Sequence, residues 1–582
     1  MCDRHGVLRI GNCSGFYGDR LPAMREMLEG GGTGGGAGGG AGGGAGGVLD
    51  VLTGDYLAEL TMLILSRDRA ADPATGYAKS FLAQLRDCLR LALDRRVRIV
   101  SNAGGVNPDG LAAAIRELGV DARIATVRNV EQDGGHAYLG AFGIARALEA
   151  GADIVITGRV TDASLVVGPA IARFGWNRTD LDALAGATVA GHVLECGTQS
   201  TGGNYAFFAE IADLGRPGFP IAEIRPDGSS VITKHPGTGG AVTAGTVTAQ
   251  LVYEIGDARY PGPDVTTRLD TIELRQQGKD RVEIFGVRGE APPPDLKVAH
   301  TAVGGFRNEL TVVLTGLDIE AKAALFRRQF EAAARTRPAE VTWTLTRLDR
   351  PDAPTQQQAS ALLTVVARDK DEKVAGRAFA DGAVELALAS YPGFFATSPP
   401  GRAHPYGVFT ASYVPQREHE VVLADGTVEA IAPPTVTRAL EPLPGPEAGD
   451  PGRNKENERS FPEKERSFPP TRSLPLGTLA GARSGDKGGD ANIGLWVRDA
   501  RAYPWLRDLI TERTLKALLP EAAELPIRVT RLPRVNAVNV VIEGLLGQGV
   551  AYNARFDPQA KGLGEWLRSR HVDIPAWLLE DA

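Results

Sequence analysis

The sequence has few cysteines, no long apolar run and no excess of positive charge. Its four cysteines, Cys2, Cys13, Cys88 and Cys196, form no CxxC pair, which argues against a structural zinc site or a disulfide framework. No run of 18 apolar residues occurs and no apolar signal segment opens the chain, so we expect a cytoplasmic protein without a membrane span. The formal net charge of -7 argues against nucleic acid as a partner.

Several catalytic signatures are also missing. No GK[ST] follows a glycine-rich loop, no HExxH occurs, and no clear Ser-His-Asp order is present. The sequence therefore supports neither ATP binding by a P-loop nor the zinc-protease and serine-hydrolase templates.

Length and two low-complexity segments predict several domains. The chain has 582 residues, too many for one ordinary core. Residues 30–47 are nearly all glycine and predict a flexible loop, and residues 442–472, which repeat ERSFP, predict a disordered linker. We therefore expect an α/β domain over residues 1–260, an α+β lobe over 261–441 and a small α+β domain over 473–582.

Strands and helices alternate through the first 255 residues. Buried strands are predicted at Val7–Asn12, Val48–Gly54, Arg96–Asn102, Ala122–Val127 and Ala152–Gly158. Helices are predicted at Arg20–Glu29, Tyr56–Arg67, Ala78–Arg95, Ala137–Ala150 and Asp162–Phe174, and another after Asn107, which Pro108 and Asp109 identify as an N-cap. This alternation indicates a mostly parallel sheet with helices on both faces.

The rest of the chain mixes strands and helices in another order. EVTWTLTRLD and ALLTVVARD predict strands, and Glu320–Arg335 and Phe379–Ala389 predict helices. Near the carboxyl terminus, LGTLAGAR, ANIGLWVRD, IRVTRLP and AVNVVIEGLL predict strands, with one helix at Tyr503–Leu518. Both regions are typical of α+β structure.

Polar loops that contain glycine follow four of the predicted strands. They are Gly11–Arg20, Thr53–Tyr56, Ser101–Asp109 and Thr157–Ser164. In a parallel sheet, ligands bind beyond the carboxyl ends of the strands, so we expect Asp55, Asn102 and Asp162 around one pocket. A tight turn or helix cap explains any single loop, but four loops on one edge favour a binding site.

The candidate site residues divide by chemistry. Asp55, Asp162 and Glu195 are carboxylates suited to general acid or base catalysis. Arg20, Arg159 and Lys234 have the charge to neutralise a substrate anion, and the GTGG turn after Lys234 fits either coenzyme A phosphates or a hairpin. The other candidate binding residues of this region lie in polar or glycine-rich loops: Asp19, Asn102, Asn107, Thr201, Gly237 and Gly239.

Cys196, in HVLECGTQSTGGNY, raises the alternative of a nucleophilic thiol. A nucleophilic cysteine must be a thiolate, and the adjacent Glu195 would raise the thiol pKa. His192 would neighbour Cys196 on a helix, but on a strand the two would lie roughly 13 Å apart. We therefore favour a buried structural cysteine, with Glu195 as the stronger catalytic candidate.

The loop SGDKGGDANIG near the carboxyl terminus carries Asp486, Lys487 and Asn492. Asp and Asn commonly cap a tight hairpin, which is one interpretation. The other is a polar loop that completes the site on the large domain. The sequence leaves both open.

Taken in order, the motifs resemble a known family. IGNCSGFYGDR, LTGDYLAELTM, VSNAGGVNP, ITGRVTDASLVVGP, AGHVLECGTQSTGGNY, ITKHPGTGGAVTAGTVTAQLVYEI and ADGAVELALASYPGF resemble the acyclic terpene utilisation (AtuA-like) family. ARSGDKGGDANIGLWV and NAVNVVIEGLLGQGV resemble its attached ferredoxin-like domain. The resemblance implies a role in the catabolism of branched acyclic terpenes such as citronellol and geraniol, through acyl-CoA intermediates.

Two hypotheses from different classes follow. The first is an enzyme that acts on a coenzyme A thioester or a carboxylate by lyase, hydratase or thioester chemistry. The second is a non-catalytic subunit or scaffold of an acyl-CoA carboxylase-type complex. No cofactor is certain; a divalent metal held by Asp19, Asp55 and Asp162 remains an alternative, and a homo-oligomer stays open.

Overall fold

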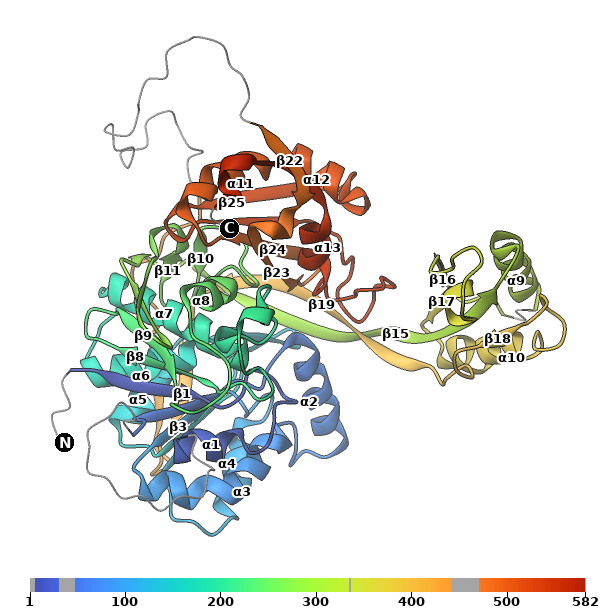
Figure 1. The fold of residues 1–582 in the computed structure, drawn as a ribbon. Helices are drawn as coiled ribbons and strands as arrows, with labels where there is room; N and C mark the ends of the chain where they lie inside the picture. Colours follow the sequence, from blue (N-terminus) through green and yellow to red (C-terminus); the bar gives the residue numbers. More distant parts are fainter. Residues whose placement is uncertain (1–5, 31–47, 334–335, 442–469, 581–582) are drawn as a thin grey trace. The chain divides into compact units, whose positions relative to one another are not determined.

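The computed structural model describes residues 6–30, 48–333, 336–441 and 470–580, and the chain divides into two compact units (Figure 1). The first unit comprises Met1–His300, Thr410–Leu546 and Gln559–Ala582, and the second Thr301–Phe409 and Gly547–Pro558. The predicted glycine loop, from residue 31 on, and most of the predicted linker lie outside the described residues. No helix among the described residues is long and apolar enough to cross a bilayer.

The first unit is built on a sheet of 11 described strands with a parallel centre. The central order is β1 (Leu8–Asn12), β2 (Val51–Gly54), β3 (Arg98–Ser101), β7 (Ile154–Thr157) and β4 (Ile124–Val127), all parallel. Antiparallel strands extend both sides: β8 (Pro220–Ile224), β9 (Ser230–Lys234), β13 (Arg281–Phe285) and β12 (Glu273–Gly278) beside β1, and β20 (His419–Val422) and β21 (Val428–Ile431) beside β4. Because the central strands are parallel, their carboxyl ends share one edge.

Helices cover both faces of this sheet. One apolar core joins the strands to α1 (Ala23–Glu29), α3 (Lys79–Asp94) and α4 (Pro108–Arg116). The other joins them to α5 (Phe142–Glu149), α6 (Ser164–Phe174) and α7 (Leu181–Glu195). The strands are buried on both faces, which explains their continuous apolar sequences. The predicted α/β class is confirmed.

One predicted helix begins later than expected. Residues 131–137 form a hairpin, β5 (Glu131–Gln132) and β6 (Gly135–Ala137), so the helix predicted from Ala137 starts at Phe142. The hairpin turn places Asp133 at φ 50° and Gly134 at φ 77°. An Asp-Gly pair with two positive φ angles is typical of a two-residue hairpin turn, which the local sequence therefore encoded.

Asn107 caps α4 as predicted. Its side-chain oxygen accepts the Gly110 N–H over 3.0 Å, and its amide nitrogen donates to the Thr75 carbonyl over 2.8 Å. We expect Asn107→Ala to lower the free energy of unfolding by about 1–2 kcal/mol, because both the cap and the bond to the neighbouring loop are lost. Urea denaturation would measure it, and an unchanged midpoint would contradict this assignment.

The second unit has its own core. It contains α9 (Ile319–Ala333), β16 (Glu340–Thr346), β17 (Ser360–Asp369) and α10 (Phe379–Val384), with aromatic packing centred on Phe326. Strand β15 (Asp295–Thr315) contributes residues to both units, as does β19 (His404–Pro415). The unit is therefore shorter than the lobe expected over 261–441, because the ends of that range belong to the first unit.

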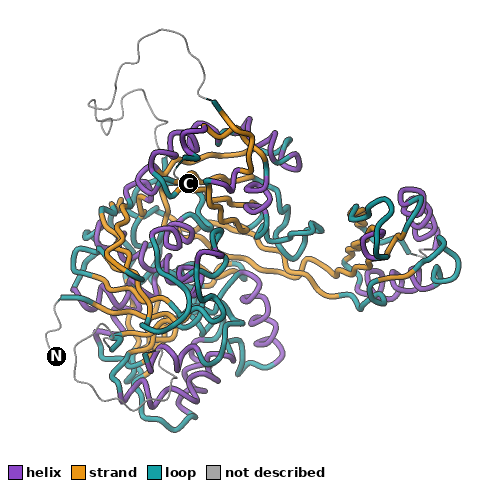
Figure 2. The backbone as a smooth tube through the Cα atoms, in the orientation of Figure 1, coloured by secondary structure: helices purple, strands orange, loops and turns teal. Residues whose placement is uncertain are grey.

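The carboxyl-terminal region forms a four-stranded antiparallel sheet, β23 (Ala480–Lys487), β24 (Asp490–Val497), β26 (Ala537–Ile542) and β25 (Ile527–Leu532). Helices α11 (Tyr503–Leu509), α12 (Glu512–Leu518) and α13 (Leu563–Ser569) accompany it (Figure 2). The single helix predicted at Tyr503–Leu518 is thus two helices, since Thr511 caps the second. This region contacts α8 (Ala244–Leu251) within the first unit.

Candidate active site

Asp55 and Asn102 form a buried pair at the carboxyl ends of β2 and β3. The Asn102 amide nitrogen donates to the Asp55 carboxylate over 2.6 Å, and the same carboxylate oxygen accepts the Leu57 N–H over 3.0 Å. The Asn102 oxygen accepts the Tyr56 N–H over 2.8 Å. Asp55 is 5% exposed and Asn102 0%, so neighbouring strands fix the position of this carboxylate.

Arg159 and Asp162 follow β7, the strand beside β3. The Arg159 guanidinium is buried, donates to the Val160 carbonyl over 2.6 Å and pairs with the Asp162 carboxylate. It also stacks over the Tyr138 ring, 4.7 Å from its centre. The charges of Asp162, Tyr138 and Asp55 outweigh burial and raise the pKa of Arg159, so it stays a cation.

His192 and Glu195 lie at the carboxyl end of α7, which ends at Glu195, so Cys196 is the residue that follows the helix. His192 and Glu195 are separated by about one helical turn, and His192 Nδ1 lies 2.8 Å from Glu195 Oε1. The Nε2 atom of His192 is buried without a hydrogen-bond partner among the described residues. The Asn12 side chain, at the end of β1, donates to the Leu194 carbonyl and holds the end of α7 at the edge of the sheet.

The loop after β1 approaches the turn after α7 very closely. A Cβ atom at Gly15 would lie 2.5 Å from the carbonyl carbon of Cys196 and 2.7 Å from the nitrogen of Gly197. Only glycine permits this approach without displacing the turn. The contact places Glu195 at the edge where Asp55 also lies.

Burial raises the pKa values of two carboxyls at this edge. For Asp55, burial and the charge of Asp162 raise the pKa well above its usual range, against the opposing effects of Arg159 and Asn102. For Glu195, burial also raises the pKa, and its pairing with His192 opposes that effect. Carboxyls with raised pKa values can give and take protons nearer neutral pH.

The same electrostatics disfavour a thiolate at Cys196. Burial and the charges of Glu195 and Glu254 raise the pKa of its thiol well above the usual range. Cys196 is half-buried rather than fully buried as expected from the sequence, because it follows the last residue of α7. Its environment therefore supports a structural role.

The structure adds Glu254 to the candidate residues. Its backbone has φ 56°, a left-handed conformation uncommon outside glycine. The Asn492 side chain accepts the Glu254 N–H over 2.8 Å, and Lys487 donates to the Glu254 carbonyl over 2.6 Å. Lys487 ends β23 and Asn492 lies on β24, so the segment predicted as a hairpin or a polar loop is a β-hairpin. This hairpin fixes a strained residue whose charge raises the pKa values of Glu195 and Cys196.

Lys561 and Tyr260 were also missed by sequence reasoning. Lys561 lies 3.4 Å from the carboxylates of both Glu254 and Asp486, and it pairs with the Tyr253 hydroxyl. Burial, followed by the charges of Glu195 and three neighbouring groups, raises the pKa of Tyr260. No local motif marks either residue, because their neighbours come from distant parts of the chain.

Other sequence candidates have local structural partners instead. Arg20 pairs with Glu26 over 2.9 Å, and Lys234 donates to the Thr238 carbonyl over 2.7 Å, beside the turn that holds Gly237 and Gly239. The Thr201 hydroxyl donates to the Gly218 carbonyl over 2.7 Å. Asn107 is the α4 cap described above, and Asp19 accepts the Gly15 N–H over 2.7 Å. The side chains of Arg20, Lys234, Thr201, Asn107 and Asp19 are therefore engaged in structural contacts, and their part in a binding site stays a prediction.

Among the described residues, Asp19, Asp55 and Asp162 are not arranged as a group of metal ligands. Within the described ranges, no group of three or more His, Cys, Asp or Glu side chains is arranged to hold a metal ion. The Asp55 carboxylate is instead engaged by N–H donors, and Asp162 by Arg159.

Comparison with protein-family models accounts for most of the sequence. The model described as acyclic terpene utilisation family protein AtuA matches residues 8–134 and 128–424. The chain belongs to the acyclic terpene utilisation (AtuA) family. Residues 474–573 match the AtuA ferredoxin-like domain, which contributes Asp486, Lys487 and Asn492 to the contacts around Glu254. Comparison with curated proteins and with solved structures found no match.

Proposed function

We propose that this AtuA-family chain is an enzyme of acyl-CoA or branched-acid catabolism that uses Asp55 and Glu195 for general acid and base chemistry. Family membership supports acyclic terpene utilisation as the metabolic setting. The observation that carries the proposal is that two carboxyls with raised pKa values lie at the carboxyl edge of the parallel sheet: Asp55, which is buried and held by Asn102, and Glu195, which is paired with His192; the buried Arg159 cation acts on Asp55. A coenzyme A thioester or a free carboxylate is the substrate group we expect.

The chemistry requires proton transfer near a carbonyl group. Lyase, hydratase and thioester reactions of acyl-CoA substrates share this requirement. We assign the proton transfers to the Asp55 and Glu195 carboxyls, whose pKa values are raised, and stabilisation of negative charge on the carbonyl oxygen to Arg159. Lys487, whose ammonium lies 5.8 Å from the centre of the Tyr260 ring, adds positive charge on the ferredoxin-like side.

The proposal is tested by incubating the full-length protein with branched and unbranched acyl-CoA esters and with the corresponding free acids. We expect mass spectrometry to detect conversion of at least one ester. We also expect that ester, at 100 times its dissociation constant, to stabilise the fold by about 2.7 kcal/mol, measured as a higher Tm. The isosteric Asp55→Asn protein is the negative control for turnover. If no member of the panel is converted or raises the Tm, the proposal is wrong.

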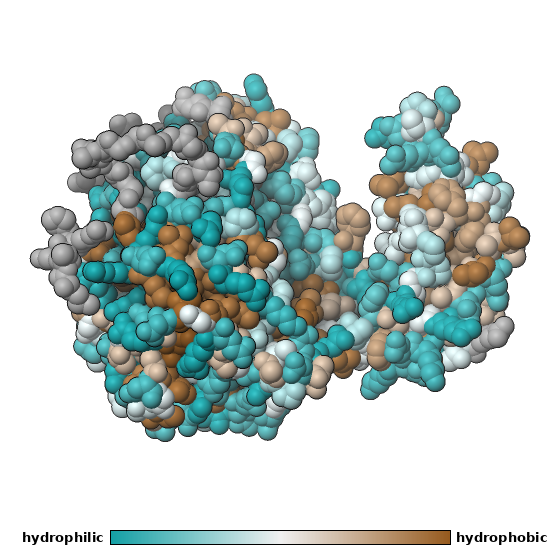
Figure 3. Space-filling view, turned by 90° about the horizontal axis from the view of Figure 1, so that it is seen from below, coloured by the Kyte–Doolittle hydropathy of each residue, from teal (hydrophilic) through white to brown (hydrophobic). Residues whose placement is uncertain are grey.

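A subunit or scaffold role has one supporting observation. Three large apolar side chains of the second unit are almost fully in solvent: Leu317 at 82%, Leu388 at 102% and Phe556 at 96% exposure. Figure 3 shows apolar surface on this unit. Exposed apolar side chains of this size suit contact with another protein. Under this alternative, the chain would bind carboxylase subunits and convert none of the esters.

A further inference from the structure

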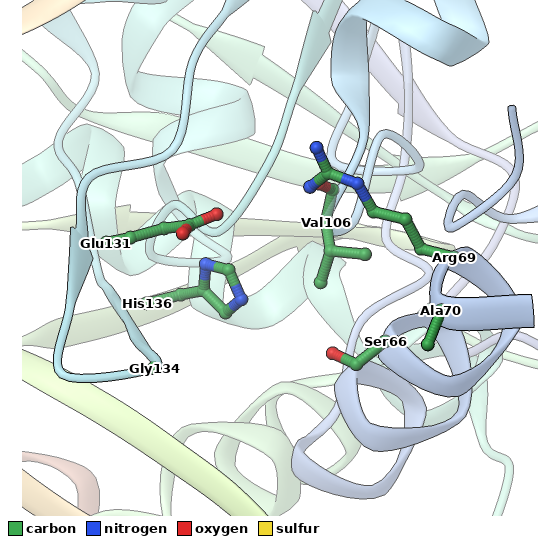
Figure 4. A pocket seen from close by; sticks show the side chains of 7 residues that line it. All are labelled: Ser66, Arg69, Ala70, Val106, Glu131, Gly134 and His136. Carbon is green, nitrogen blue, oxygen red and sulfur yellow. The ribbon is translucent and has the colours of Figure 1, made fainter. Parts of the chain in front are cut away.

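A cavity of about 280 Å3 opens between α2 (Glu59–Ala71) and the β5–β6 hairpin, within the first unit. Figure 4 shows side chains from both elements facing a common space. Its lining combines charged, polar and apolar groups from Ser66, Arg69, Ala70, Val106, Glu131, Gly134 and His136. Neither the family match nor the proposed chemistry assigns a role to this cavity.

Arg69 brings positive charge to one side of the cavity. One of its terminal nitrogens donates to the Val106 carbonyl, which fixes the direction of the side chain. Within the described residues, its guanidinium forms no ion pair with a carboxylate. Its remaining N–H groups are suited to a ligand carboxylate, which an arginine can bind through two hydrogen bonds.

The hairpin presents a different pair of groups on the other side. Glu131 and His136 are directly opposite each other in the β5–β6 ladder, and both side chains line the cavity. The Nδ1 atom of His136 is buried without a hydrogen-bond partner among the described residues. Burial lowers the pKa of His136, with Arg69 and Arg159 adding to the effect and Glu131 opposing it, so the imidazole is neutral near pH 7.

A hydroxyl group matches this pair. A hydroxyl can donate a hydrogen bond to a carboxylate and at the same time form a second bond with an imidazole nitrogen. No hydrogen bond to another described residue engages the His136 ring, which lines the cavity, so the ring can bond to such a ligand. Val106 and Ala70 complete the lining with apolar surface that suits a short aliphatic chain.

We propose that this cavity binds a small hydroxycarboxylate. Arg69 holds the carboxylate, Glu131 and His136 hold the hydroxyl, and the aliphatic part lies against Val106 and Ala70. Because Arg69 and the hairpin lie on different sides of the cavity, a 3-hydroxy acid suits it. Binding at this cavity does not depend on the reaction proposed above.

The test is calorimetric titration of the full-length protein with 3-hydroxyhexanoate, hexanoate and inorganic phosphate. We expect 3-hydroxyhexanoate to bind about tenfold more tightly than hexanoate, the gain typical of one hydrogen bond to a charged group. Arg69→Gln should weaken binding of both acids by about 10- to 100-fold. Glu131→Gln and His136→Asn should each reduce the preference for the hydroxy acid.

Arg67→Gln is the matched control, since Arg67 is also exposed on α2 but does not line the cavity. It should bind both acids like the unmodified protein. Equal affinity of the Arg69→Gln and Arg67→Gln proteins would overturn the proposal, as would phosphate binding as tight as that of 3-hydroxyhexanoate. If Arg69→Gln failed to fold, the His136→Asn protein would still decide the role of the hydroxyl, because loss of the preference is measured against hexanoate in the same protein.

Discussion

Asp55→Asn is expected to lower turnover by about 10²–10⁴-fold and, at mildly alkaline pH, to raise the melting temperature. The loss of turnover follows from removing a general acid or base. The gain in stability follows from burial, which raises the pKa of Asp55 and so makes its charged form costly in the folded state. The asparagine oxygen can still accept from Leu57 and Asn102, so the local fold should persist.

The pH dependence has a definite direction. The folded-state pKa of Asp55 lies above the unfolded value, so between the two the folded chain keeps a proton that the unfolded chain has lost. Stability therefore falls as pH rises through that interval, and Asp55→Asn removes this loss. Below the pKa of an aspartate in the unfolded chain, about 3.9, both the folded and the unfolded chain carry this proton. The pH-dependent part of the stability gained by Asp55→Asn is therefore absent there. Because Asp55 interacts with Asp162, the pH range over which stability changes reflects the titration of both carboxyls together.

The measurement is a set of thermal melts of both proteins across pH, with turnover measured at the same pH values. Asp121→Asn is the control, because Asp121 is an exposed aspartate away from the described contacts. An Asp55→Asn protein that melts below the unmodified protein at every pH would show that the Asp55 carboxyl stabilises the fold. Full turnover by the Asp55→Asn protein would show that Asp55 takes no part in the reaction.

The sequence predicted the sheet edge well because its signals are local. Continuous apolar strands such as Ile154–Thr157 need helices on both faces, so their pattern alone indicates a parallel sheet. Asp55 and Asn102 follow such strands directly, Asp162 follows β7 after a short loop, and parallel strands bring their carboxyl ends to one edge. Their proximity thus depends on topology more than on details of packing.

The rest of the site depends on contacts between distant residues. Lys561 and Glu254 are 307 positions apart, and the ferredoxin-like domain has to pack beside α8 before they meet. Lys234 illustrates the opposite case, a local signal with two interpretations. A lysine before a glycine turn fits either a phosphate site or a hairpin, and here its ammonium donates to the Thr238 carbonyl within the turn and lies 3.4 Å from Asp280.

Glu195→Gln is expected to lower turnover by about 10²–10⁴-fold, whereas Cys196→Ser should keep most of it. Glu195 is paired with His192 and has a raised pKa, so its carboxyl is suited to proton transfer. Glutamine keeps the length and polarity of the side chain but cannot transfer the proton. Serine matches the small polar character of a thiol that stays protonated, since burial and nearby carboxylates raise the pKa of Cys196.

Two further readouts separate this assignment from a nucleophilic thiol. Glu195 raises the pKa of His192, so Glu195→Gln should lower the pH at which the His192 imidazole titrates, which NMR of labelled histidine can follow. Modification of Cys196 by iodoacetamide, located by peptide mass spectrometry, should be slow at neutral pH and accelerate as pH rises, because only the thiolate reacts. A folded Cys196→Ser protein without turnover, together with an active Glu195→Gln protein and fast labelling at pH 7, would instead identify the thiol as the nucleophile. In that case Glu195 and His192 would act on Cys196, and the raised thiol pKa would have to fall when substrate binds.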